Sequence, residues 1–389
     1  MNKFLKIIVI KTYTLASYII SSISRKLTKI VNNRIVIICN CGNGYCCNPK
    51  YIVEAMEELY PGKFEFILLT NKVNLNIPKY IKQIRYRRLL SIYYLSTAKF
   101  WIDNFRTPKY MGKLKKQFYV QTWHGGLGIK KVEKDAEQVL PVEYIKTAIE
   151  DGKITDLMFA NNELTKQIYK KSFWYSGSVI RCGMPRNHYL VHCDDRRKFK
   201  IKQKIGINKD IKLVLYAPTF RKDLNIDIYN INFQKITEYL NVRFDGIFKC
   251  MYRLHPALGK ISKTALFSGA INVTNYPDVQ ELLEITDVLI TDYSSIAEDF
   301  ALTKKPIFIY APDIDDYMND RGFYYSVYER PFPLAENIEG LLLNIEKFNY
   351  DEYNKNVNFF FKRFNLIDDG YGDRCIAKKI NSIYEENNI

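Results

Sequence analysis

The chain has 389 residues, of which 47% are hydrophobic and 26% charged. This composition gives room for two α/β domains with buried cores and excludes a disordered protein. The net charge of +16 is concentrated in residues 1–40, with +7, and residues 79–116, with +10, so the remainder sums to −1. Such basic surfaces predict docking to an anionic membrane face or a polyphosphate-like polymer, unless the chain is simply a soluble basic protein.

Residues 1–32 are apolar and basic, and they are expected to form an amphipathic, membrane-associating helix. Their longest uncharged stretch, residues 12–24, is shorter than the ~20 residues that span a bilayer. No small-residue cleavage site follows an apolar core, so we expect no secretory signal. We expect a peripheral protein on the cytoplasmic face of the cell membrane; a helix packed on the protein's own core is the alternative. The apolar face comprises Leu15, Ile19, Ile23, Leu27 and Ile30.

The eight cysteines show no disulfide-like framework, which indicates a reducing cytosol. Cys39, Cys41, Cys46 and Cys47 cluster, but adjacent Cys46 and Cys47 would be strained as ligands of one ion. We therefore expect no metal site here.

Buried-type strands alternate with helical or basic segments through residues 33–200, which predicts a first domain with a parallel sheet flanked by helices. The expected strands are 34–40, 64–70, 99–103, 117–122, 156–160 and 179–185, and the expected helices are 48–60, 142–151 and 163–173.

Two glycine-containing loops follow strands of this first domain. Gly42 and Gly44 lie between a strand and a helix, a shape typical of ligand-binding turns in Rossmann-like domains. His124 precedes three glycines within four residues, which leave its imidazole uncovered at a strand's carboxyl end. With an ordinary pKa near ~6.5, His124 would accept a proton from an attacking hydroxyl at neutral pH. The alternative is a hydrogen-bonded structural histidine.

A second alternation occupies residues 201–389, which we expect to form a second Rossmann-like domain. Its expected strands are 212–216, 247–254, 271–273, 287–291 and 306–310, and its expected helices are 278–285, 296–302, 338–347 and 373–386. The last helix is expected to pack back on the domain junction.

Three strands of the second domain end in groups that suit a phosphate, namely Arg221, His255 and Ser294. Parallel topology brings such strand ends to one edge of the sheet. Ser294 and Ser295 would offer hydroxyls and free backbone N–H groups at the start of a helix, which predicts an anion site. Alternatively, Ser294 is only a helix cap, with Glu298 near the capping-box position.

Five motifs in this order resemble the CDP-glycerol glycerophosphotransferases of teichoic acid synthesis. They are Trp123-His124-Gly125, Tyr216-Ala217-Pro218-Thr219-Phe220-Arg221, Arg253-Leu254-His255-Pro256, Thr291-Asp292-Tyr293-Ser294-Ser295 and Arg321-Gly322-Phe323-Tyr324, and the resemblance covers roughly residues 33–380.

The resemblance implies a glycosyltransferase B architecture of two Rossmann-like domains, with an acceptor-side first domain, a donor-side second domain and the active site between them. It implies a peripheral membrane enzyme that moves a polyol phosphate, glycerol phosphate first and ribitol phosphate as the alternative, from a CDP-activated donor. The acceptor would be a hydroxyl of a lipid-linked saccharide or a polyol-phosphate polymer, and CMP would be released. We expect no cofactor and no metal.

The resemblance also assigns residues. His124 matches the proposed base and His255 a histidine that contacts the donor diphosphate. The expected donor-binding residues are Thr219, Arg221, Arg253, Asp292, Ser294 and Ser295, and the expected acceptor-side residues are Gly42, Gly44, Trp123, Gly125 and Gly126.

The chain departs from the family pattern directly after Trp123-His124-Gly125, where Gly126-Leu127-Gly128-Ile129 replaces a shorter Thr-Pro-Leu segment. We expect a looser loop there, and this departure leaves two acceptors open, a wall teichoic acid or a capsular polymer. A nucleotide-sugar-dependent glycosyltransferase of the same fold is the alternative function. Nucleic-acid binding is not expected, because it would leave the strand ends of the second domain unexplained.

Overall fold

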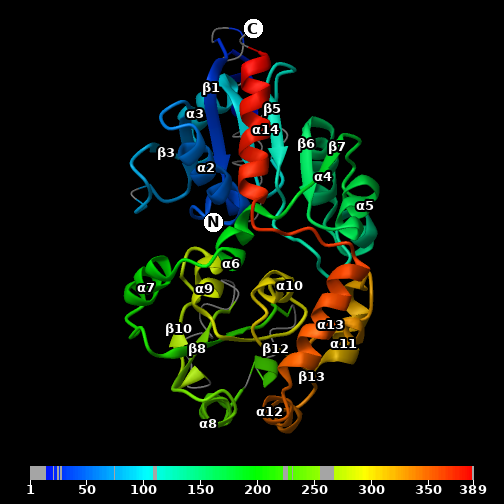
Figure 1. The fold of residues 1–389 in the computed structure, drawn as a ribbon. Coiled ribbons are helices and arrows are strands. Elements are labelled where there is room, and N and C mark those ends of the chain that lie inside the picture. The colour runs from blue at the N-terminus through cyan, green and yellow to red at the C-terminus, as the bar shows by residue number, and fades with distance from the viewer. Residues whose placement is uncertain are drawn as a thin grey trace, which may run out of the picture.

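The structure is a computed structural model that describes residues 15–20, 22–23, 26, 29–73, 75–107, 112–221, 227–229, 231–254 and 267–387. These residues form two Rossmann-like units, upper and lower in Figure 1, each built on a parallel sheet flanked by helices. This is the α/β architecture expected from the sequence.

The first unit contains a seven-stranded sheet of order β3-β2-β1-β4-β5-β6-β7. Residues 35–38 of its inner strand β1 are a continuous buried apolar run, as expected for a strand covered on both faces. The order reverses between β1 and β4, so a crevice opens at the carboxyl ends of these strands. The strands are β1 Val31–Ile38, β2 Glu65–Thr70, β3 Ile81–Arg85, β4 Ala98–Asp103, β5 Phe118–Gln121, β6 Leu157–Ala160 and β7 Ser178–Arg181, and the helices are α2 Cys47–Leu59, α3 Leu89–Thr97, α4 Val142–Ile154 and α5 Glu163–Ser172.

The second unit repeats this topology in a six-stranded sheet of order β10-β9-β8-β11-β12-β13, which reverses between β8 and β11. The short helices α6 His188–Val191 and α7 Asp195–Lys204 lead into it. Its strands are β8 Lys212–Ala217, β9 Phe248–Tyr252, β10 Ile271–Asn272, β11 Val288–Thr291, β12 Ile307–Tyr310 and β13 Leu334–Ala335, and its helices are α8 Phe233–Arg243, α9 Val279–Ile285, α10 Ile296–Phe300, α11 Ile314–Arg321, α12 Ile338–Glu346 and α13 Tyr350–Arg363.

The last helix, α14 Gly372–Glu386, lies in the upper unit beside β1 and β5, as Figure 1 shows in red. Ile376, Ala377 and Ile380 are fully buried in the core of the first unit. Gly372 permits this return, because a Cβ there would stand 1.9 Å from the carbonyl oxygen of Gly183. The assignment of residues 201–389 to the second domain is therefore wrong for this helix.

Only part of the expected N-terminal helix lies within the described residues. Residues 15–20 are helical, and Leu15, Ile19 and Ile23 are exposed, whereas Ser17 is buried. Most of residues 1–28, including Leu27 of the expected apolar face, lie outside the described residues. In the part of the chain that the structure describes, no helix has the length and apolarity needed to cross a bilayer.

Candidate active site

A cleft of about 690 Å³ separates the two units, and residues of both units line it. His124 follows β5 on the first side, and Ser294 and Ser295 follow β11 on the second. Trp123 and the glycines at 125 and 126 line the cleft beside His124. The structure thus brings the sequence-predicted histidine and the sequence-predicted phosphate turn to one cavity.

The loop after His124 reaches across to the second unit. Leu127 and Ile129 are buried in the hydrophobic core of that unit, at 2% and 1% exposure. The backbone N–H of Tyr324 donates to the carbonyl of Ile129 at 2.7 Å, and that of Lys131 donates to Gly322 at 3.1 Å. The expectation of a looser loop is therefore wrong, because the apolar residues between the glycines anchor it.

His124 is oriented by residues that follow β4 and β5. Its Nδ1 lies 2.9 Å from the backbone carbonyl oxygen of Asn104, so Nδ1 carries the proton and Nε2 keeps a lone pair. The imidazole stacks on Phe105 with ring centroids 4.4 Å apart and an interplanar angle of 8°, and Trp123 packs at 4.3 Å. The arrangement supplies a neutral imidazole with a fixed orientation.

The environment of His124 also sets its charge. Desolvation by the surrounding protein lowers the pKa of His124 to about 4; the bond to Asn104 opposes this, whereas Arg186 and Arg106 add to it. The side chain is nevertheless exposed at the cleft, so protein atoms enclose the ring without closing it off from a substrate. At neutral pH His124 is therefore an unprotonated group that a substrate can reach.

The turn that carries His124 is strained and firmly held. Trp123 has a φ of 50°, a left-handed conformation that is uncommon for a large side chain. Its N–H donates to the side chain of Gln121 at 2.9 Å, and Asn48 donates to its carbonyl at 3.2 Å. These contacts fix the direction in which His124 leaves the strand.

Two cleft residues on the first side had no signal in the sequence. Glu133 and Tyr144 line the cleft and are joined by a hydrogen bond from the Tyr144 hydroxyl. Buried Arg106 neutralises Glu133 at 2.5 Å and Asp151 at 2.9 Å. This cluster gathers residues from three separate segments, so no local pattern could have revealed it.

The turn at Ser294 and Ser295 leads into a shorter helix than the sequence predicted. Helix α10 has only five residues, so its dipole is a minor contribution. Ser295 makes no capping hydrogen bond, and Glu298 pairs with Arg330 at 2.9 Å instead of forming a capping box. The hydroxyl oxygen of Ser294 does accept a long hydrogen bond from the N–H of Ile296, at 3.5 Å, so only the capping-box part of the alternative is wrong.

Arg221 and Asp292 are placed behind this turn and do not line the cleft. Asp292 accepts hydrogen bonds from the backbone and hydroxyl of Thr219, at 2.8 and 2.6 Å, and from Arg221 at 2.7 Å. Arg221 is 5% exposed and also pairs with Asp313 at 2.6 Å. The expected direct contact of Arg221 and Asp292 with the donor is not supported, because their charges neutralise each other. Thr219 does line the cleft.

Two cations reach the cleft from opposite sides. Lys130, from the first unit, lies 3.4 Å from the hydroxyl of Thr219. Arg253 follows β9, and its Nη1 donates to the carbonyls of Val273 at 3.1 Å and Tyr276 at 2.6 Å, which fixes the guanidinium at the cleft. His255, the second expected catalytic residue, lies outside the described residues.

Gly42 and Gly44 do not line the cleft. Both have positive φ, 84° and 106°, and a Cβ at residue 42 would stand 2.8 Å from the ring of Tyr86. Their loop instead supports the site indirectly, because the N–H of Asn40 donates to the side chain of Asn104 at 2.7 Å. The cleft therefore gives no support to the expected acceptor contact of these two glycines, which stays a prediction.

All eight cysteines are free thiols. Within the described ranges, no group of three His, Cys, Asp or Glu side chains is arranged to hold a metal ion. Metal independence stays a prediction.

Comparisons with known proteins agree with this geometry. Residues 19–382 match the family model of CDP-glycerol:poly(glycerophosphate) glycerophosphotransferases. A teichoic acid poly(glycerol phosphate) polymerase of Bacillus spizizenii is 30% identical over 96% of this chain and 98% of its own length. A teichoic acid glycerol-phosphate transferase of Staphylococcus aureus is 28% identical over 91% of this chain and 94% of its own.

The chain spans about half the length of the polymerases of Bacillus subtilis and Staphylococcus epidermidis that it also matches. Among solved structures, a variant of the wall teichoic acid polymerase TagF soaked with CDPG superposes with a TM-score of 0.84 and 27% identity. That comparison covers 99% of this chain and 97% of the TagF chain.

Proposed function

The chain belongs to the CDP-glycerol:poly(glycerophosphate) glycerophosphotransferase family and is thus a transferase of the glycosyltransferase B fold, and we propose that it uses the cleft to move glycerol phosphate from CDP-glycerol to an acceptor hydroxyl. The acceptor is a hydroxyl of a growing polymer or of a lipid-linked saccharide. The single observation that carries this proposal is that His124 and the Ser294 turn line one cleft.

On the acceptor side, His124 acts as the base. Its Nε2 lone pair is free because Nδ1 donates to Asn104. As the acceptor oxygen attacks the phosphorus atom next to glycerol, its proton passes to Nε2. The new O–P bond forms while the diphosphate P–O bond breaks, and the electron pair leaves with CMP.

On the donor side, the cleft supplies positive charge and hydrogen-bond donors for the diphosphate. Lys130 and Arg253 flank it, and Ser294 and Ser295 offer hydroxyls or amides. The N–H and the hydroxyl of Thr219 already donate to Asp292. Groups fixed before the reaction stabilise the charge that develops on the leaving phosphate. Because both units contribute, the leaving phosphate is held between them.

The test is a donor screen. The purified protein is incubated with CDP-glycerol, CDP-ribitol and several nucleotide sugars, together with a synthetic lipid-linked acceptor, and nucleotide release is measured. CMP release with CDP-glycerol and a product one or more glycerol phosphates heavier is expected. UDP or GDP release from a nucleotide sugar would instead favour an ordinary glycosyltransferase. The product mass also separates addition of one unit from polymerisation, and acceptors of wall and capsular type separate those two roles.

We further propose that the enzyme works on the cytoplasmic face of the membrane. Leu15, Ile19 and Ile23 expose apolar side chains, and at the start of α3 Leu89 and Leu90 are 63% and 52% exposed next to basic residues. Apolar and basic side chains side by side suit an anionic lipid surface. Sedimentation with vesicles containing anionic lipids, but not with neutral ones, is the expected outcome, whereas equal recovery in both supernatants would contradict it.

A further inference from the structure

We propose that Arg330 is a positioning residue that turns two backbone amides of the segment 292–295 toward the cleft. The inference rests on the proposed function, since it assigns these amides to the donor diphosphate. It is carried by the hydrogen bonds of Arg330 and by the geometry of the peptide unit.

Arg330 holds the turn from behind. Its Nη1 donates to the carbonyl oxygen of Asp292 at 2.5 Å, and its Nη2 donates to that of Ser294 at 3.0 Å. The third contact, from Nε to Glu298 at 2.9 Å, is an ion pair in which both side chains are almost fully buried. The guanidinium is thus fixed by one carboxylate and fixes two carbonyl groups.

The direction of these carbonyls determines the direction of the next amides. In a trans peptide the C=O of one residue and the N–H of the following residue point in opposite directions, and the described residues contain no cis peptide bond. The N–H groups of Tyr293 and Ser295 therefore point away from Arg330. No hydrogen bond from either amide to another described residue exists.

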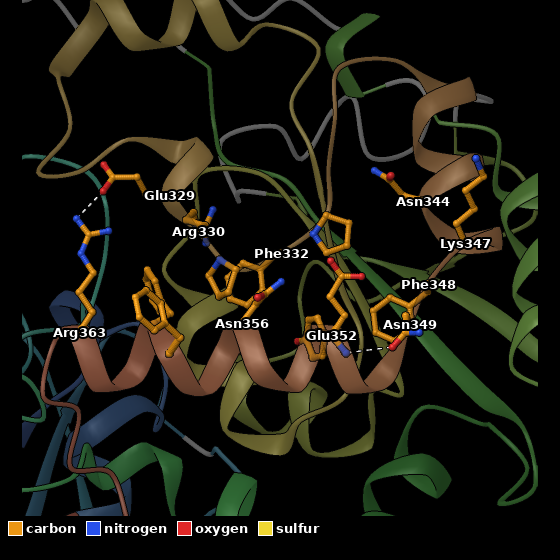
Figure 2. Close-up of a pocket in the computed structure, with 15 residues that line it drawn as sticks. Glu329, Arg330, Phe332, Asn344, Lys347, Phe348, Asn349, Glu352, Asn356 and Arg363 are labelled. Atoms are coloured by element: carbon orange, nitrogen blue, oxygen red, sulfur yellow. Dashed lines mark hydrogen bonds and ion pairs between the residues drawn. The ribbon is translucent and has the colours of Figure 1, made fainter.

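The side away from Arg330 is the cleft. Tyr293, Ser294 and Ser295 line the cleft, whereas Arg330 does not line it and lines a separate hollow of about 430 Å³ instead. Figure 2 shows this hollow, with Arg330 in the wall and helix α13 Tyr350–Arg363 beneath. Two amides aimed into the cleft form a cradle for a phosphate oxygen.

An arginine is required because one planar group must reach two carbonyls and a carboxylate together. A lysine at 330 would keep the charge opposite Glu298 but would lack the fork that spans both carbonyls. Asp292 is also held through its carboxylate by Thr219 and Arg221. The Asp292 side chain is therefore fixed independently, and Arg330 sets the orientation of the peptide planes in residues 292–295.

The decisive comparison uses two variants that differ only at residue 330. Removing Arg330 alone would leave the buried carboxylate of Glu298 unpaired, which destabilises a protein strongly. We therefore compare Glu298→Gln with the double variant Glu298→Gln and Arg330→Met, in which neither buried charge remains. Arg330→Lys tests the fork, and Arg363→Met is the matched control, because Arg363 is 43% exposed on the rim of the same hollow in Figure 2.

Binding of CDP-glycerol is measured by calorimetry, binding of cytidine by ligand-detected NMR, and KM for donor and acceptor from CMP release. We expect the double variant to bind CDP-glycerol at least about tenfold more weakly than Glu298→Gln, with cytidine binding unchanged within about twofold. The donor KM should rise while the acceptor KM stays level. The affinity of Arg330→Lys for CDP-glycerol should lie between that of Glu298→Gln and that of the double variant. The affinity of Arg363→Met should match that of the wild type.

Equal affinity of the double variant and Glu298→Gln for CDP-glycerol, with cooperative unfolding retained, would overturn the proposal. A parallel loss of cytidine and CDP-glycerol binding would also overturn it, because a merely distorted domain would behave in that way. A wild-type protein that neither binds nor consumes CDP-glycerol would refute the proposed function itself, before any variant is compared.

Discussion

The Nδ1 atom of His124 and the backbone carbonyl oxygen of Asn104 lie 2.9 Å apart at the ends of neighbouring strands. The Asn104 side chain is itself held by the N–H of Asn40 after β1. Three adjacent strand ends therefore set the orientation of one imidazole. The parallel topology enforces this relationship, because it brings the carboxyl ends of β1, β4 and β5 to one edge.

Replacing His124 with alanine should lower kcat about 10² to 10⁴-fold, because a positioned base contributes a factor of that order. CDP-glycerol affinity and the unfolding midpoint should change little, since the ring lies at the cleft surface. Steady-state CMP release and calorimetry check this. Turnover of His124→Ala within about tenfold of the wild type would rule out the base.

The pH profile should reflect the lowered pKa of His124, about 4 against an ordinary 6.5. Protonation removes the base, and a lower pKa keeps the base form present at lower pH. On the acid side, kcat/KM should therefore stay level from about pH 7 to about pH 5 and fall only below that.

A fall in kcat/KM near pH 6.5 that is absent from His124→Gln would contradict the lowered pKa.

The lowered pKa of His124 in the folded protein also affects stability. The unfolded chain binds this proton more readily than the folded protein, so His124 should lower the free energy of unfolding as pH falls from 6.5 toward 4. Unfolding midpoints of wild type and His124→Gln across this range provide the check.

Gly128 keeps the two sides of the cleft in contact. A Cβ at residue 128 would stand 3.3 Å from the Cβ of Ser295. Gly128→Ala should therefore raise the donor KM slightly, and Gly128→Val should raise it about tenfold or more, because the branched side chain must displace the turn. An unchanged donor KM in the valine variant would show that the two loops separate freely.

A buried ion pair joins the units. Arg186, which precedes α6, donates to Asp299 of α10 at 2.7 Å, and their side chains are 4% and 5% exposed. Arg186→Met leaves Asp299 unpaired and should cost about 3 to 5 kcal/mol of stability.

Chemical denaturation measures this loss. Lys146→Met is the matched control, because its partner Glu143 and Lys146 itself are largely exposed, and a pair of this kind contributes about 0 to 1 kcal/mol. Equal stability of the two variants would show that the pair at Arg186 does not hold the units together.

Removal of divalent metals should leave the initial rate unchanged within about twofold, because Lys130, Arg253 and the turn amides supply the charge that the leaving phosphate needs. Rates before and after dialysis against a chelator test this. A loss of activity that magnesium restores would contradict it and place a cation with the donor.

The sequence determined the strands closely. The predicted strand at 212–216 is β8 Lys212–Ala217, and the predicted helix at 163–173 is α5 Glu163–Ser172. Strand β3 and helix α3 were missed, because their charged and aromatic residues obscure the apolar periodicity. Strand β13 and helices α8, α11 and α13 were also not predicted. His124, Ser294 and Ser295 were found because short motifs at strand ends are local signals.

Only the tertiary structure decided which charged and apolar groups face the cleft. The sequence predicts Arg221 as a phosphate ligand, but its guanidinium pairs with Asp292 and Asp313. The sequence predicts a loose loop at Leu127, but this side chain is buried in the core of the other unit. A sequence pattern reports whether one segment is buried, because burial sets its periodicity. The partner of a buried charge or apolar side chain is chosen by chain folding over many intervening residues, so no window of sequence contains it.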